Sequence, residues 1–209
     1  MLAARLSAHV YLGLALLVVA TLHTGFHFDW NIHTFAYALM CVVIFSGIFG
    51  IYIYANFPRL MTENRGSVGM PEMVSGVVSL NDRLRREAQP LDDNVTRLVR
   101  AAVEETQLSG GVWRQLSGNY PHCTTAAAIV GMDAAQATLL PENEPVWREV
   151  RILLERKATL LRQIRRDLRY KAYMDIWLYF HVPFTFALLA ALLAHIVLVI
   201  FFLPVLPRV

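Results

Sequence analysis

One uncharged segment near the C-terminus constrains the fold of this chain more than any other feature. Residues 176–206 contain no Asp, Glu, Lys or Arg and exceed the roughly 20 apolar residues that a helix needs to cross a bilayer. Two histidines, His181 and His195, interrupt it, and ionisable side chains inside a membrane usually mark a functional site with a partner. Their separation corresponds to a rise of roughly 21 Å, with both side chains within about 40° of the same face. The sequence therefore predicts a membrane helix with one ligand-type nitrogen near each leaflet.

The first apolar segment, residues 6–28, repeats this arrangement with His9 and His23 at the same separation. Two b-type haems stacked across a bilayer require this layout, because each iron takes one imidazole from each of two facing helices. In these four histidines the sequence resembles the dihaem membrane cytochromes b, including the respiratory cytochrome b, in which two helices each carry two histidines at this kind of spacing. The resemblance implies two haem b cofactors and covers the predicted membrane helices, not the region between them.

Composition agrees with a membrane protein and argues against several other cofactors. Hydrophobic residues make up 56% of the chain and charged residues only 17%, which is too apolar for an ordinary soluble domain. Cys41 and Cys123 are the only cysteines. They argue against covalent c-type haem, an iron–sulfur cluster or a structural zinc site. The first apolar run is longer than the core of a signal peptide, so we expect a retained helix.

The pattern of charge predicts an all-α membrane protein with three transmembrane helices and a helical insert between the second and third. Residues 1–57 form a transmembrane hairpin, with helices at 6–28 and 33–57. Charged residues begin after Pro58, and residues 58–171 form a water-facing, mainly helical insert. From Pro145 apolar residues recur at helical spacing with no proline before Pro183, so the third membrane segment, within 172–209, continues a preceding basic helix.

Basic residues near the membrane ends predict the orientation. The short connection between the first two helices offers Asp29 and no Lys or Arg, and only Arg208 lies beyond the third helix. The basic residues on the opposite side are Arg5, Arg59, Arg65, Arg162, Arg165, Arg166, Arg169 and Lys171. By the positive-inside rule the N-terminus and the insert are cytoplasmic and the C-terminus is outside, in the inner membrane of a bacterium. The first and third helices then run in the same direction.

This orientation pairs the four histidines by depth. His9 with His181 would hold the iron of an inner haem, and His23 with His195 that of an outer haem. A competing interpretation treats them as polar residues that join helices by hydrogen bonds.

Further residues are candidates for cofactor contacts. Arg59, Arg169 and Lys171 would contact the propionates of the inner haem, although basic residues at helix ends also serve as topology determinants. Glycines could let a porphyrin approach the backbone. They are Gly13, Gly25, Gly47 and Gly50.

The connection after the first helix offers a third group of candidates. His27, Asp29 and His33 could line a quinone site or a proton path at the outer surface, or simply form hydrogen bonds at the interface. His27 competes with His23 as a ligand, because a residue four positions later shares the same helical face.

The leading hypothesis is a dihaem cytochrome b subunit that transfers electrons across the membrane. It would exchange electrons with quinone or with a neighbouring membrane or peripheral redox subunit, within a larger respiratory or photosynthetic oxidoreductase. Three helices are one too few to enclose two haems, so a second copy or another chain would supply a fourth. A non-redox membrane anchor or signalling scaffold and a metal or haem transporter are the alternatives. Nucleic-acid binding is poorly supported, because no recognition module accompanies the basic residues.

Overall fold

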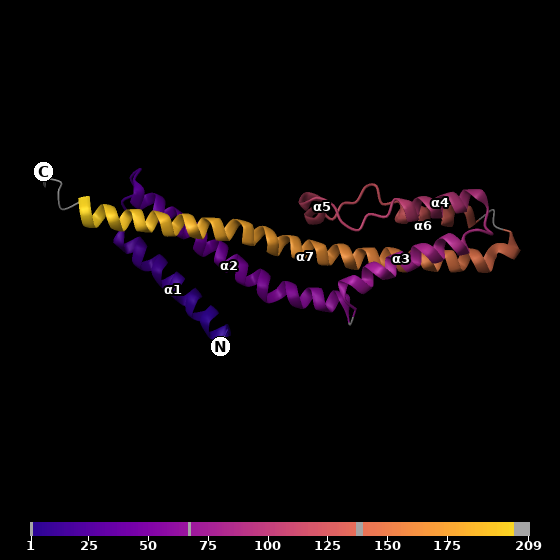
Figure 1. The fold of residues 1–209 in the computed structure, drawn as a ribbon, viewed down its shortest axis with the longest axis horizontal. Helices are drawn as coiled ribbons and strands as arrows, with labels where there is room; N and C mark the ends of the chain where they lie inside the picture. The colour runs from indigo at the N-terminus through magenta and orange to yellow at the C-terminus, as the bar shows by residue number, and fades with distance from the viewer. Residues whose placement is uncertain (1, 67, 137–139, 203–209) are drawn as a thin grey trace. The chain divides into compact units, whose positions relative to one another are not determined.

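The computed structural model describes residues 2–66, 68–136 and 140–202, with side chains from Ala8 to Phe201. Within these residues every regular element is a helix, which confirms the all-α class. The elements are α1 (Leu2–His23), α2 (Ile32–Arg65), α3 (Met70–Glu87), α4 (Asp93–Glu104), α5 (Val112–Ser117), α6 (Thr125–Ala135), η2 (Pro141–Asn143), α7 (Glu144–Val197) and η3 (Leu198–Phe202), as Figure 1 shows. Arg208 and the end of the predicted third segment lie outside the described residues, as does the side chain of Arg5.

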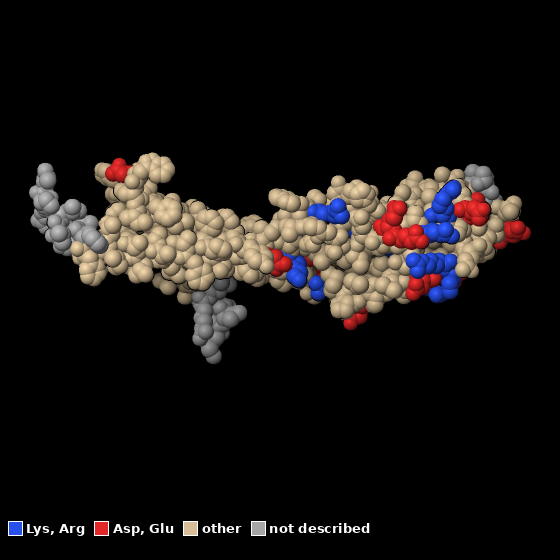
Figure 2. All heavy atoms as spheres, turned by 45° about the horizontal axis from the view of Figure 1, so that its top comes forward, with Lys and Arg blue, Asp and Glu red and all other residues tan. Residues whose placement is uncertain are grey.

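The chain divides into two compact units. The apolar unit comprises Met1–Asn56 with Tyr173–Val209, and the charged unit comprises Phe57–Ala172. On the face shown in Figure 2, Lys, Arg, Asp and Glu side chains gather over the charged unit, whereas the surface of the apolar unit is almost entirely uncharged.

Three helices build the apolar unit: α1, the first part of α2 and the last part of α7. Their common core contains the buried side chains of Leu39 and Met40 from α2 and Leu188 from α7, with Leu17 of α1 packed against it. Many large apolar side chains remain exposed, which soluble proteins rarely allow over a contiguous area. By length and composition α2 and α7 each contain a stretch able to cross a membrane, and α1 adds the shorter apolar stretch Ala8–His23.

Helix α1 ends at His23, so the predicted helix boundary at residue 28 is wrong. Gly25 and Phe26 both have positive φ angles, 57° and 61°, and this left-handed turn stops the helix. The next helix starts where the Asn31 side chain accepts a hydrogen bond from the backbone N–H of Thr34, at 3.0 Å, an N-capping contact.

Helix α2 continues through Pro58 to Arg65, past the predicted boundary at residue 57. Contacts within the charged unit explain this extension. Asp167 of α7, fully buried, forms an ion pair with Arg65 and accepts a hydrogen bond from Asn64 Nδ2 at 2.8 Å. Asn64 Nδ2 also donates to the carbonyl of Gln163 at 2.8 Å. These contacts hold the last turn of α2 in helical form.

The charged unit packs α3, α4 and α6 against the first part of α7. Its largest core cluster includes Leu84 of α3, Val99 of α4, Met132 of α6 and Leu153 of α7. Asp92 caps α4 by accepting the N–H of Val95 at 2.8 Å. The unit thus has a hydrophobic core of its own.

Candidate functional site

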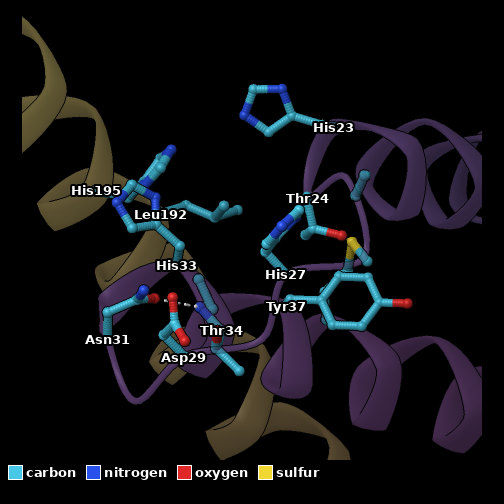
Figure 3. A pocket seen from close by; sticks show the side chains of 13 residues that line it. His23, Thr24, His27, Asp29, Asn31, His33, Thr34, Tyr37, Leu192 and His195 are labelled. Carbon is cyan, nitrogen blue, oxygen red and sulfur yellow. Dashed lines mark hydrogen bonds between the residues drawn. The ribbon is translucent and has the colours of Figure 1, made fainter.

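A cavity of about 290 Å³ lies in the apolar unit, where the end of α1, the connection to α2, the start of α2 and the end of α7 meet. This volume is just below the range of roughly 300–1,000 Å³ for small-molecule sites. Figure 3 shows its lining. The chemically active members are His23, His27, Asp29, His33, Tyr37 and His195. Of the residues predicted for the outer end of the membrane helices, the structure therefore brings together His23, His195 and the three candidates for a quinone or proton site.

His33 and His195 lie ring to ring at one side of this cavity. Their ring centroids are 4.3 Å apart with an interplanar angle of 85°, and Figure 3 shows this contact. An iron porphyrin cannot fit between two rings at that distance. The Nδ1 atom of His195 is buried and has no hydrogen-bond partner within the described part of the chain. His195 therefore retains an unused nitrogen inside the site.

His23 and His27 reach the cavity from different structures. His23 is the last residue of α1, whereas His27 lies in the connection that follows. The expectation that His27 shares a helical face with His23 is therefore wrong. The Nδ1 atom of His27 is 2.8 Å from the carbonyl oxygen of Gly25, a contact within its own turn. His23 is thus the histidine that α1 itself presents to this cavity.

The second group of predicted ligands lies elsewhere in the same unit. His9 of α1 and His181 of α7 are close enough for their charges to interact, as are His23 and His33 with His195. The side chains of His181 and His195 are half-buried, and those of His9 and His23 are exposed. The sequence-predicted partners thus lie near one another, with the α1 side of each pair left uncovered by this chain.

His181 is held by two residues that the sequence reasoning missed. Its Nδ1 atom lies 2.7 Å from Ser46 Oγ, and its ring stacks on that of Trp177, with centroids 4.8 Å apart and an interplanar angle of 19°. Trp177 Nε1–H donates to the carbonyl oxygen of Ser46 at 2.6 Å. Trp177 precedes His181 by one helical turn, a spacing that could have indicated the stack.

The glycines proposed to accommodate a porphyrin differ in what they face. A Cβ at Gly50 would overlap the indole of Trp177, so this glycine serves helix packing. A Cβ at Gly47 would lie 3.6 Å from His181 Cε1, an ordinary contact beside the candidate ligand. Gly13 faces Ile44, and Gly25 forms the turn after α1. Only Gly47 therefore borders a predicted ligand on the helix that faces it.

The candidate propionate ligands belong to the charged unit, and two of them have protein partners. Arg59 forms an ion pair with Glu63 at 2.8 Å. Arg169 donates to the carbonyl oxygen of Ser117 at 3.2 Å. Lys171 is exposed. Their assignment to haem propionates stays a prediction.

A second group of titratable side chains lies inside the charged unit. Lys157 is fully buried, and its Nζ donates to the carbonyl oxygen of Ala102 and to Thr106 Oγ1, both at 2.6 Å. Burial lowers the pKa of Lys157 to about 8, while the nearby Cys123 opposes this shift. Burial alone would raise the pKa of the Cys123 thiol, but a hydrogen bond from the Arg165 side chain and others from neighbouring groups bring it below its usual value. This group is separate from the histidines and belongs to the insert.

Comparison of the chain with known family models, characterised proteins and solved structures yields no match.

Proposed function

We propose that this chain is a membrane-embedded dihaem cytochrome b subunit that transfers electrons across a bilayer. One observation carries the proposal: His9 of α1 is near enough to His181 of α7, and His23 of α1 near enough to His195 of α7, for their charges to interact. Each pair takes one imidazole from each of two helices, which is the arrangement that axial ligation of iron requires.

The donor atoms available on α7 fit a bis-imidazole site. Within the described residues His195 keeps a buried Nδ1 without a partner, and the hydrogen bond of His181 with Ser46 uses Nδ1, which leaves Nε2 for a ligand. His33 already contacts His195 too closely for iron to lie between them. His23 is therefore the partner of His195 in this proposal. Haem, when bound, supplies one-electron redox chemistry, and the chain sets its position and access.

The surface of the apolar unit supports a membrane location. Exposed phenylalanines such as Phe45 and Phe186 are 61% and 67% accessible and have no reason to face water. In the proposed topology α1, the first part of α2 and the last part of α7 span the inner membrane of a bacterium. The charged unit is cytoplasmic, in accordance with the basic residues that flank the spans.

The uncovered side of each histidine pair suggests what the partner contributes. His9 and His23 are exposed on α1, so three helices of one chain leave both pairs open on that side. A helix from another redox subunit or from a second copy would close it. His27, Asp29 and His33 line the outer cavity, and in this proposal they exchange protons with a quinone bound there.

A haem count on the purified membrane protein tests the proposal. A reduced-minus-oxidised spectrum should show a b-type α band, and pyridine haemochrome analysis should give two haems per chain. His181→Ala and His195→Ala should each remove one haem and leave the other, because each breaks one pair. His122→Ala, which changes an exposed histidine of the charged unit, is the matched control and should keep both.

The alternatives predict different results in the same experiment. Protein without a b-type spectrum would overturn the proposal and favour a non-redox anchor or scaffold. A transporter that uses the histidines as transient ligands would lose bound haem or metal on dialysis.

A further inference from the structure

The Ser46 hydroxyl group occupies a position between a backbone carbonyl and the candidate inner ligand. Its Oγ donates to the carbonyl oxygen of Val43 at 2.9 Å and lies 2.7 Å from His181 Nδ1. A serine hydroxyl has one proton and two lone pairs. Because the proton is directed to Val43, the contact with His181 requires Nδ1 to be the donor and Ser46 Oγ the acceptor.

This arrangement selects one tautomer of His181. A neutral imidazole with its proton on Nδ1 has its free lone pair on Nε2. Ligating histidines usually donate their other ring N–H to a nearby acceptor, which orients the ring and makes the ligand nitrogen more basic. Ser46 supplies that acceptor from α2, a helix that carries none of the four proposed ligands.

Trp177 restricts rotation of the His181 ring out of its plane. Its indole stacks on His181, while its own N–H donates to the carbonyl oxygen of Ser46 at 2.6 Å. Ser46 therefore contacts the imidazole through its side chain and the stacking partner through its backbone. The same residue fixes both the protonation and the plane of the ligand.

The outer site has no equivalent. His195 Nδ1 is buried and unpaired within the described residues, and the ring contacts His33 instead. A change at position 46 should therefore act on one of the two sites only, which makes the role of Ser46 measurable against an internal reference.

We propose that Ser46 is a positioning residue that directs Nε2 of His181 to the inner iron and increases the electron donation of this ligand. The inference rests on the proposed function. A ligand that donates more electron density favours ferric over ferrous iron, so Ser46 lowers the reduction potential of the inner haem.

The test is a potentiometric titration of both haems in the intact membrane protein, comparing wild type with Ser46→Ala and Ser46→Thr. The inner component is the one that His181→Ala removes. Ser46→Ala should shift the inner ferric–ferrous equilibrium about tenfold toward ferrous, a rise of about 59 mV for one electron, with the outer component unchanged. Ser46→Thr keeps a hydroxyl that can bond the preceding turn, and should restore the wild-type potential.

The outcomes separate this inference from the proposed function. Two haems in the wild type with an unchanged inner potential in Ser46→Ala would overturn the role of Ser46 and leave the dihaem function intact. Equal shifts of both components would also overturn it, because they indicate general loosening. Selective loss of the inner haem in Ser46→Ala, with the haem retained in Ser46→Thr, would support it. A wild type without haem would refute the dihaem function itself.

Discussion

The indole of Trp177 on α7 packs against Gly50 of α2 and occupies the space that a side chain at position 50 would need. The close approach lets the indole reach both the Ser46 carbonyl and the His181 ring. Gly50, which has no side chain to react, thus determines the surroundings of the candidate ligand His181.

Replacing this glycine should disturb the inner site. In Gly50→Ala the new methyl group overlaps the indole, so Trp177 must move and lose its hydrogen bond to Ser46. Overpacking of this kind costs about 1–3 kcal/mol. Gly47→Ala adds the same methyl group to the same helix at an ordinary 3.6 Å from His181 Cε1, and is the matched control. In detergent, the unfolding temperature of Gly50→Ala should be well below that of Gly47→Ala. Equal unfolding temperatures would contradict the packing argument.

The ion pair between Arg65 and Asp167 should contribute much more to stability than the surface pair between Arg59 and Glu63. Asp167 is fully buried, and Asp167→Ala removes the ion-pair partner of Arg65 and one of the two acceptors of Asn64 Nδ2. Breaking a buried pair costs about 3–5 kcal/mol. The Glu63→Ala control breaks a largely exposed pair, which contributes about 0–1 kcal/mol. Guanidinium unfolding followed by circular dichroism compares the two, and similar losses would show that Asp167 is not a buried anchor.

Lys157 should make the stability of the chain depend on alkaline pH. Its pKa is about 8 in the folded protein against 10.5 for an ordinary lysine. Between these values the unfolded chain binds a proton that the folded chain has released, so stability rises with pH through this window. Below about pH 8 both states are protonated, and the penalty for burying the charge is constant.

The comparison is with Lys157→Met, which removes the buried ammonium. The difference in unfolding free energy between wild type and this variant should increase in favour of the wild type from pH 8 to 10. The exposed Lys171→Met is the control, and its difference from the wild type should stay flat. A flat profile for Lys157→Met would mean that the folded protein keeps this proton.

Cys123 should react with alkylating reagents as a partly ionised thiol. Burial raises the pKa of this thiol, but the hydrogen bonds from Arg165 and from neighbouring groups together outweigh burial and lower the pKa below its usual value. In a Cys41→Ala background the rate of iodoacetamide labelling against pH should therefore have its midpoint below that of a free thiol. Arg165→Gln should move the midpoint to higher pH. Identical midpoints with and without Arg165 would exclude the guanidinium as the cause.

The sequence was sufficient for the helical class, because long uncharged runs and helical periodicity are local signals. It was insufficient where a helix end depends on other contacts. The apolar run to Phe28 hid the left-handed turn at Gly25 and Phe26, which ends α1 at His23. Pro58 predicted the end of α2, but contacts of Asn64 and Arg65 with Asp167, a residue distant in sequence, carry the helix further.

The candidate site was predictable to the same degree. The spacing of the four histidines on two segments was enough to predict their pairing, which stays a prediction until haem is measured. Trp177 could have been found by its spacing from His181. Ser46 could not, because which side of α2 faces α7 depends on the rotation of the helices against each other.

The turn that stops α1 at His23 also has an electrostatic consequence. The carbonyl end of a helix carries the equivalent of roughly −0.5 elementary charge, and here it falls at the outer candidate ligand rather than beyond it. The macrodipole of α1 would therefore favour the more positively charged oxidation state of a metal held at His23, and lengthening the helix past Gly25 would move that field away from the site.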